Sequence, residues 1–211
     1  MKGFFNMKKL FLLLFFTFIT YANAQNAQNA QNTQTSTHSF PIDEKATAIA
    51  PWKVGETVAT INQHVVASDL SSKDTELPGY RVFLGITTDN YFLVQDFYEN
   101  GNKYSDPYQL IRQSAVLNNS PDWHTALHGA LVTYYPTGEK MVDKYSIQGH
   151  FAKETNIWYP SGQLFQQMRY IRTGNLFTIY YPNGQKNLER QYNPKGQVIQ
   201  MQEWDENGNL K

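Results

Sequence analysis

The 211-residue chain contains no cysteine. This absence excludes disulfides, thiolate metal sites, cysteine nucleophiles and a lipid anchor attached through cysteine. Charged residues are also sparse, at 17% of the chain, and no run of lysine and arginine occurs after Lys9. Because phosphate binding needs a clustered basic surface, we expect no nucleic-acid partner.

Motifs for common enzyme chemistries are also missing. The chain has no Gly-x-Ser-x-Gly nucleophile elbow and no glycine loop of the kind that cradles phosphate. Its carboxylates, such as Asp143, Glu154, Glu189 and Glu203, are spread along the sequence, and nothing pairs two of them for acid-base work. The sequence therefore predicts a non-enzymatic protein without a cofactor.

Two histidines, His124 and His128, are candidate metal ligands. His124 and His128 stand four residues apart, a spacing that on a helix would place two imidazoles on one face, as in zinc sites. Only Asp122 offers a nearby third ligand, and the segment ends at Gly129. We interpret the two histidines as surface residues, with a metal hydrolase built on them as an alternative.

The first 24 residues have the three parts of a secretory signal peptide. An apolar run at residues 10–19 follows a basic start and precedes Ala22-Asn23-Ala24, a small-x-small cleavage site. The run is too short to span a bilayer. We expect cleavage before Gln25, a periplasmic or secreted protein, and no membrane span after cleavage. Cleavage would remove the three lysines of residues 1–24 and leave 15 basic against 18 acidic residues.

Two segments follow before the regular part of the chain. Residues 25–39 are rich in Asn, Ala and Gln and predict a disordered linker, since they cannot bury enough apolar area to offset the entropy of ordering. Residues 40–79 predict a small non-repetitive N-terminal cap. Within the cap, residues 56–70 fit a short helix or two strands.

The second half is organised around a repeated turn motif, and Tyr180-Tyr181-Pro182-Asn183-Gly184 is its clearest copy. An aromatic residue stands four before the glycine, usually with a second aromatic three before it. Close copies end at Gly101, Gly138, Gly162 and Gly208, and weaker copies end at Gly149, Gly174 and Gly196. Proline followed two residues later by glycine predicts a type I turn with a glycine bulge, joining two antiparallel strands.

This spacing predicts an all-β protein. From Gly138 onward the glycines recur every 10 to 13 residues, which is the length of one strand and one turn. We expect an antiparallel β-meander of hairpin repeats, a single-layer sheet, over residues 80–211. Residues 80–86 and 91–98 form its expected first hairpin. Residues 106–128 are interpreted as an insertion, in which one further strand is expected over residues 108–116. Close copies of the turn then share one edge of the sheet.

The paired aromatics and the Tyr-Tyr-x-Asn-Gly-like turn resemble the MORN-repeat variant found in the YwqK-family antitoxin of toxin-antitoxin systems. The resemblance covers residues 129–211, with an outlying copy around Gly101. It implies a fold of MORN-like hairpin repeats and a protein partner such as a toxin, which the sheet would neutralise by occlusion. Together with the export signal, it implies an immunity-like role in the periplasm.

The aromatics of the motif provide the predicted binding site. The residue four before each glycine is expected to pack on its equivalent in the next repeat. The residue three before points to the opposite face and is expected to form an open tyrosine stripe that contacts another protein. Binding to an envelope glycan, with tryptophans stacked on sugar rings, is the alternative. The predicted binding residues are Tyr98, Tyr135, Trp158, Tyr159, Tyr181 and Trp204.

Overall fold

The computed structural model describes residues 40–66, 73–117 and 123–211. The expected signal peptide and linker, residues 1–39, lie outside the described residues. Residues 40–211 form one compact unit. The helices are α2 (Glu44–Ala48), α3 (Gln113–Leu117) and the 3-10 helix η2 (Trp123–Ala126). The strands are β1 (Thr57–Val65), β2 (Thr75–Ile86), β3 (Phe92–Tyr98), β4 (Tyr108–Leu110), β5 (Leu127–Tyr134), β6 (Lys140–Ile147), β7 (His150–Phe151), β8 (Thr155–Trp158), β9 (Leu164–Ile171), β10 (Gly174–Tyr180), β11 (Lys186–Tyr192) and β12 (Val198–Glu203).

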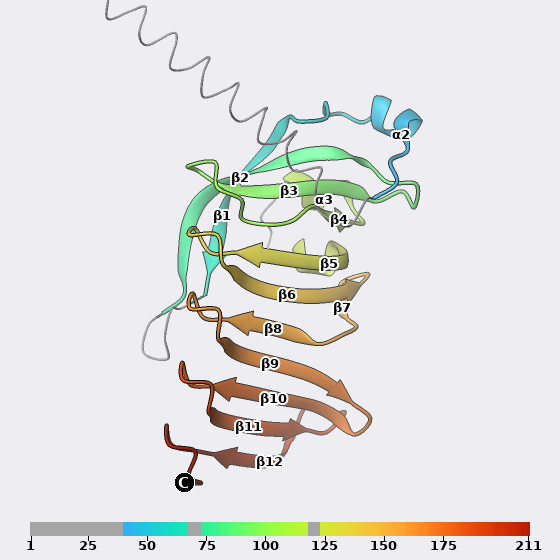
Figure 1. Cartoon of the computed structure of the whole chain (residues 1–211). Helices are drawn as coiled ribbons and strands as arrows, with labels where there is room; N and C mark the ends of the chain where they lie inside the picture. Colours follow the sequence, from blue (N-terminus) through green and yellow to red (C-terminus); the bar gives the residue numbers. More distant parts are fainter. Residues whose placement is uncertain (1–39, 67–72, 118–122) are drawn as a thin grey trace, which may run out of the picture. The chain divides into compact units, whose positions relative to one another are not determined.

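Within the described residues, twelve strands form one antiparallel sheet, shown in Figure 1. The strand order is β1-β2-β3-β4-β5-β6-β8-β9-β10-β11-β12, and β7 pairs with β6 beside this path. Each strand of the path therefore lies next to the strand that follows it, apart from the side branch at β7. The predicted all-β antiparallel meander is confirmed.

The turns have the geometry that the motif predicts. Gly138 donates its N–H to the Tyr135 carbonyl at 2.9 Å, and Gly184 donates to Tyr181 at 2.9 Å. Both glycines have positive φ, +101° and +87°. Glycine adopts this conformation without the steric cost that a Cβ would add. A register shift lies beside each turn, as between Thr133 and Tyr134. The close copies of the turn lie along one edge of the sheet, on the left in Figure 1.

The segment before the repeats joins the same sheet. Residues 57–65 form strand β1, which pairs with β2 along its length. Strand β2 begins at Thr75, so the expected boundary at residue 80 falls inside a strand. Helix α2 is a single short turn whose N-cap carboxylate, on Asp43, accepts from the Ala46 N–H at 3.0 Å. In the insertion, the strand expected over residues 108–116 ends at residue 110, and α3 follows.

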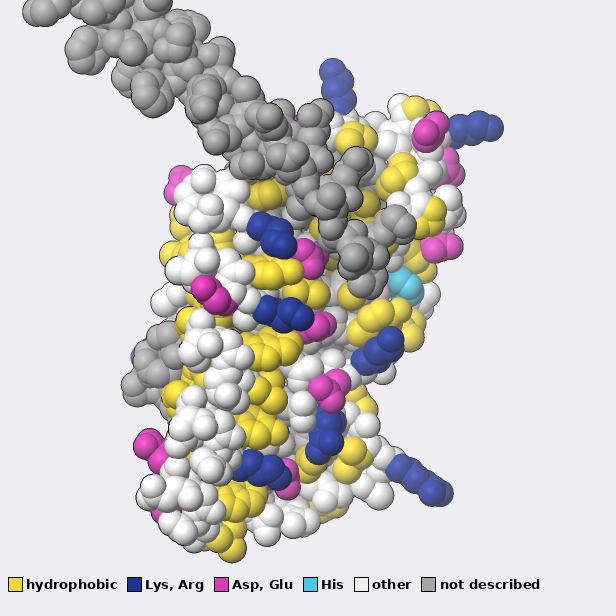
Figure 2. Space-filling model, in the orientation of Figure 1, with side chains coloured by type: hydrophobic (Ala, Val, Ile, Leu, Met, Phe, Trp, Pro, Cys, Tyr) yellow, Lys and Arg dark blue, Asp and Glu magenta, His cyan; other side chains and the backbone are white. Residues whose placement is uncertain are grey.

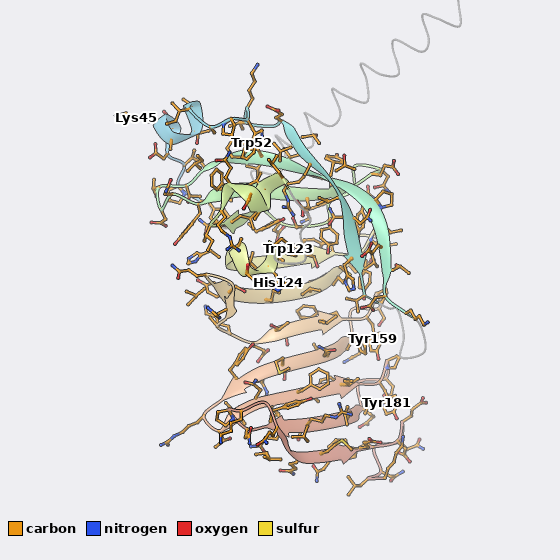
Figure 3. All side chains as sticks on the ribbon, turned by 180° about the vertical axis from the view of Figure 1, so that it is seen from behind. Lys45, Trp52, Trp123, His124, Tyr159 and Tyr181 are labelled. Carbon is orange, nitrogen blue, oxygen red and sulfur yellow. The ribbon has the colours of Figure 1, made fainter. Side chains whose placement is uncertain are left out.

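The two faces of the sheet differ, and β5 shows how. Leu127, Leu131 and Thr133 are buried, whereas the alternate residues, including Val132 and Tyr134, are half-buried. The buried side is called the inner face here, because residues from β1, α3 and η2 pack against it (Figure 3). The opposite side is the outer face.

Burial is concentrated in the first half of the unit. One inner-face cluster contains Val94, Tyr108, Leu110, Ala115, Val116, Ala126, Leu127 and Leu131. A second contains Val66, Tyr135 and Met141. Further along the sheet, strand β10 has one buried residue, Thr178, and β11 has one, Leu188. The later strands therefore form a thinner, single-layer part of the sheet.

Candidate binding surface

The tyrosine three before each turn glycine links one repeat to the next. The Tyr135 hydroxyl donates to the Trp158 carbonyl at 2.7 Å, Tyr159 donates to the Tyr180 carbonyl at 2.7 Å, and Tyr181 donates to the Trp204 carbonyl at 2.9 Å. The Tyr98 hydroxyl makes the same bond to the Tyr134 carbonyl across the insertion, at 2.8 Å. We call this set the tyrosine relay. Figure 3 shows Tyr159 and Tyr181 one below the other near the turn-bearing edge.

The expected open stripe of tyrosines is therefore wrong. The four tyrosines of the relay are 1% to 7% exposed. They lie on the inner side of the turns, where Tyr159 packs on Phe165 with ring centroids 4.7 Å apart. Their burial has a physical reason, since each hydroxyl finds a backbone acceptor and each ring fills the space between adjacent turns. The side chains of Tyr98, Tyr135, Tyr159 and Tyr181 are not available to a partner of the folded protein.

The residues four before each glycine lie on the outer face instead. Cross-strand pairing places Tyr134 opposite Lys140, Trp158 opposite Leu164, and Tyr180 opposite Lys186. Bridges at the two ends place Phe97 opposite Lys103 and Trp204 opposite Leu210. We call these residues the aromatic–lysine row. In order along the sheet, they are Phe97, Lys103, Tyr134, Lys140, Trp158, Leu164, Tyr180, Lys186, Trp204 and Leu210.

Each lysine of the row lies over the aromatic ring of the next repeat. The Lys103 ammonium is 3.8 Å from the centroid of Tyr134, Lys140 is 5.1 Å from Trp158, and Lys186 is 5.5 Å from Trp204. Such cation–π contacts contribute about 0.5–1 kcal/mol each at exposed sites. They hold the rings in a regular order along the sheet.

Each lysine also pairs with a carboxylate three residues later. Lys103 pairs with Asp106 at 2.9 Å, Lys140 with Asp143 at 3.4 Å, and Lys186 with Glu189 at 2.6 Å. The Tyr134 hydroxyl donates to Asp106 as well, at 2.9 Å. Burial, followed by the bond to Asp106, raises the pKa of Tyr134 above its ordinary value. The row is therefore close to neutral, with paired charges along its length.

The repeat that ends at Gly162 departs from this pattern. Leu164 occupies the lysine position and Gln167 the carboxylate position. The Gln167 amide donates to Asn156 at 3.0 Å and to Glu154 at 3.1 Å. The middle of the outer face thus has an apolar side chain and an amide network where the other repeats have an ion pair.

Figure 2 shows the outer face, where basic and acidic side chains lie beside a band of hydrophobic ones. Within the row, Tyr134, Trp158, Tyr180 and Trp204 are half-buried, whereas Phe97 is 4% exposed. Trp158 and Trp204 are thus the two predicted binding residues that lie on an accessible surface. The structure separates them from the four buried tyrosines.

The histidine pair is not on one helical face. His124 lies in η2 against Trp123, and His128 lies in β5, where it stacks on Tyr91 with ring centroids 4.4 Å apart. Over the described residues, no group of three or more His, Asp or Glu side chains is placed to hold a metal ion. The two histidines therefore share the sequence spacing of a helical zinc site but not its geometry.

Sequence reasoning missed the lysines and carboxylates of the row. Lysine stands two residues after the turn glycine at 103, 140 and 186, and an acid stands five after it at 106, 143 and 189. Aligning the repeats on their glycines would have shown both positions.

These features define an antiparallel β-hairpin repeat protein with a buried tyrosine relay and an aromatic outer face. In the part of the chain that the structure describes, no helix is long and apolar enough to cross a membrane. Comparison with family models, with curated proteins and with solved structures gave no match.

Proposed function

We propose that this is an exported, non-enzymatic binding protein that contacts a protein partner through the outer face of its repeat sheet. The observation that carries the proposal is the aromatic–lysine row, in which half-buried aromatics recur at every second strand. Neighbouring aromatics are about 10 Å apart, twice the usual distance between strands. Accessible Tyr and Trp are the residue types most enriched at the centres of protein interfaces.

The paired charges fit the same role. Each exposed ion pair contributes little to stability, about 0–1 kcal/mol. Charges beside an apolar contact act mainly on the choice of partner and on its register. Lys140 and Lys186, each with its carboxylate, flank the uncharged position at Leu164. The row therefore offers an apolar centre with charged positions on both sides.

The partner that we favour is a toxin, neutralised when the sheet covers its active surface. This choice rests on the resemblance of the turn motif to MORN-like repeats of the YwqK family. The signal-peptide pattern of residues 1–24 implies that the protein would meet this partner in the periplasm or outside the cell.

A photocrosslinking experiment tests the surface. A photoreactive phenylalanine placed at Leu164, in the row, should crosslink to one partner protein during export in the native cell. The matched control places the same residue at Met168, a half-buried position on the inner face. Crosslinking of the same protein from both positions, or from neither, contradicts the proposal.

A charge reversal then tests the role of the lysines with the purified partner. The double variant Lys140→Glu and Lys186→Glu places like charges beside Asp143 and Glu189 and should weaken binding about tenfold or more, as expected for charges at an interface. Arg190→Glu, on the inner face of β11, is the control and should leave the affinity unchanged. Toxicity of the partner in cells that lack this protein would support neutralisation.

Glycan binding is the second candidate. The spacing of the aromatics is comparable to one disaccharide of an extended β-1,4-linked glycan, and Trp158 and Trp204 would stack on the sugars. Retention of the protein on purified peptidoglycan, lost in Trp158→Ala, would favour this function. Absence of retention would leave the protein partner as the better proposal.

A further inference from the structure

A cavity of about 290 Å³ lies on the inner face, away from the aromatic–lysine row. It lies between residues of β1 and β2 and residues of β3, β4, β5 and η2, and it opens to solvent beside the exposed Asn62, His64 and Glu76. Ligand pockets usually measure about 300–1,000 Å³, so this one has room for a single small ring. The cavity is independent of the proposed partner surface, which lies on the other face.

The base of the cavity is a buried hydrogen-bond network. Arg81 donates to Asp96 through Nε at 2.8 Å and through Nη2 at 2.9 Å, and its Nη1 donates to the Ala115 carbonyl at 2.7 Å. The Tyr108 hydroxyl donates to the same carboxylate at 2.8 Å. Arg81, Asp96 and Tyr108 are each at most 3% exposed.

The charges of this network are already paired. Burial alone would lower the pKa of Arg81. The charge of Asp96, the hydrogen bonds to Asp96 and the nearby Tyr108 and Tyr104 together outweigh burial and raise that pKa, so the guanidinium stays charged. Burial raises the pKa of Tyr108, which therefore stays a neutral phenol. An anion inside the cavity would find the Arg81 guanidinium already paired with Asp96 and would also face the Glu76 carboxylate, and burying an unpaired charge is costly. A ligand without negative charge is favoured.

The walls provide apolar and polar surfaces on different sides. Trp123 and Leu131 form an apolar side, and Trp123 also lies beside Tyr108 and the Lys144 ammonium, whose nitrogen is 5.3 Å from the Trp123 ring centroid. Figure 3 shows Trp123 on this face of the sheet. The polar part of the lining includes the carboxylate of Glu76 on β2 and the amide of Asn62 on β1, joined by a hydrogen bond of 3.2 Å.

We propose that this cavity binds one ring of a neutral sugar. A sugar ring has adjacent hydroxyl groups, which match planar amide, carboxylate and guanidinium groups, and an apolar C–H surface, which stacks on an aromatic ring. The cavity combines both kinds of surface at the size of one ring. Its two carboxylates, on Asp96 and Glu76, disfavour a uronic acid.

Titration with free monosaccharides tests the site. The probes are glucose, galactose and N-acetylglucosamine, with glucuronic acid as the anionic comparator, and binding is followed by ligand-observed NMR and by tryptophan fluorescence. At least one neutral sugar should bind saturably and more tightly than glucuronic acid. No saturable binding of any neutral sugar, or equal binding of glucuronic acid, overturns the proposal.

Two variants locate the binding. Leu131→Phe reduces the cavity volume and should abolish binding, although overpacking costs about 1–3 kcal/mol of stability. Glu76→Ala changes an exposed rim residue, should leave the fold intact, and should weaken binding about tenfold if one hydrogen bond to a charged group is lost. Glu189→Ala, in the outer face, is the control. An unchanged affinity in a folded Glu76→Ala and in Leu131→Phe would overturn the assignment.

Sugar binding in the cavity and partner binding at the outer face can be tested independently of each other. The Lys140→Glu and Lys186→Glu double variant should bind the sugar like the native protein. Loss of partner binding with intact sugar binding, or the reverse, shows which of the two proposals fails.

Discussion

At the scale of single residues, the tyrosine relay does most to connect one repeat with the next. Its hydroxyl donors and carbonyl acceptors are 21 to 23 residues apart in the regular repeats and 36 apart across the insertion. A buried carbonyl that loses its donor costs about 1–3 kcal/mol, whereas an exposed tyrosine hydroxyl is bonded by water. The relay should therefore be visible in unfolding experiments on single variants.

Tyr159→Phe should lower the free energy of unfolding by about 1–3 kcal/mol, because the Tyr180 carbonyl then lacks its donor. Urea unfolding followed by circular dichroism measures this change. The matched control is Tyr170→Phe, since Tyr170 is 43% exposed. Equal stability of the two variants would show that the hydroxyl bond of Tyr159 is unimportant.

Burial of the relay also predicts loss of stability at alkaline pH. Burial raises the pKa of Tyr135 from 10.0 to about 12, so the folded state prefers the neutral phenol. The stability from this preference is complete below the unfolded pKa and is lost as the pH rises through the folded value. The free energy of unfolding should therefore fall between pH 10 and pH 12.

The variant Tyr135→Phe provides the control for this effect. It should be less stable than the native protein at pH 8, because the Trp158 carbonyl loses its donor. Its free energy of unfolding should fall less steeply between pH 10 and pH 12, because one shifted phenol is missing. Identical slopes for the two proteins would exclude Tyr135 as a contributor.

Which aromatics are buried was not predictable from the motif. Tyr134 and Tyr135 have the same side chain and adjacent positions, and alternation along a strand assigns them to opposite faces without saying which face is covered. The covering elements, β1, α3 and η2, come from segments outside the regular repeat. The Arg81–Asp96 pair was missed for a similar reason, since it depends on the register between β2 and β3.

At the scale of elements, the turns were predictable and the first strand was not. A turn is specified by a few adjacent residues, and proline and glycine are the most restrictive of them. Strand β1 is specified by its pairing with β2, ten or more residues away, where Thr60 lies opposite Tyr80. Its own residues fit a helix or a strand, and tertiary pairing decides between them.

The turn at Gly174 should tolerate substitution least. A Cβ there would lie 1.9 Å from the Tyr192 carbonyl oxygen, and the φ of Gly174 is +132°. Gly174→Ala must therefore displace the backbone of β11 as well as adopt a strained conformation. We expect a loss of stability well above the roughly 1–2 kcal/mol that a left-handed conformation alone costs an alanine.

Gly196→Ala is the matched control, because Gly196 has a φ of +77° and open space around its would-be Cβ. The loss of stability in Gly196→Ala should stay near the roughly 1–2 kcal/mol that the left-handed conformation costs an alanine. Urea unfolding of both variants gives the comparison. If Gly196→Ala is as destabilising as Gly174→Ala, steric contact with β11 is not the determining factor.

At the scale of the whole unit, stability should decrease along the repeat array. Both core clusters lie where residues from β1 to β6 pack together, whereas β9 to β12 form a single layer. In repeat proteins each unit depends on its own packing and on its neighbours, so a thinner part can open while the rest stays folded. The meander was predictable from the sequence, but this difference in thickness was not, because it depends on the covering segments.

Strands β3 and β10 offer a direct comparison of the two parts by native-state hydrogen exchange. Each has backbone partners on both sides. Strand β10 pairs with β9 and β11, and β3 pairs with β2 along its length and with β4 at residues 92–94, beyond which Asp96 and Tyr98 bond to the backbone of residues 102–105. The two strands differ in layering, since six of the seven residues of β3 are buried and one of the seven of β10 is. The β10 amides should exchange through local opening at a lower free energy than those of β3, which should approach the global value. Equal protection would mean that the backbone ladder and the tyrosine relay hold the sheet together as one cooperative unit. Lower protection of β10 would instead place the row from Tyr180 to Trp204 on a part of the sheet that can adjust to a partner.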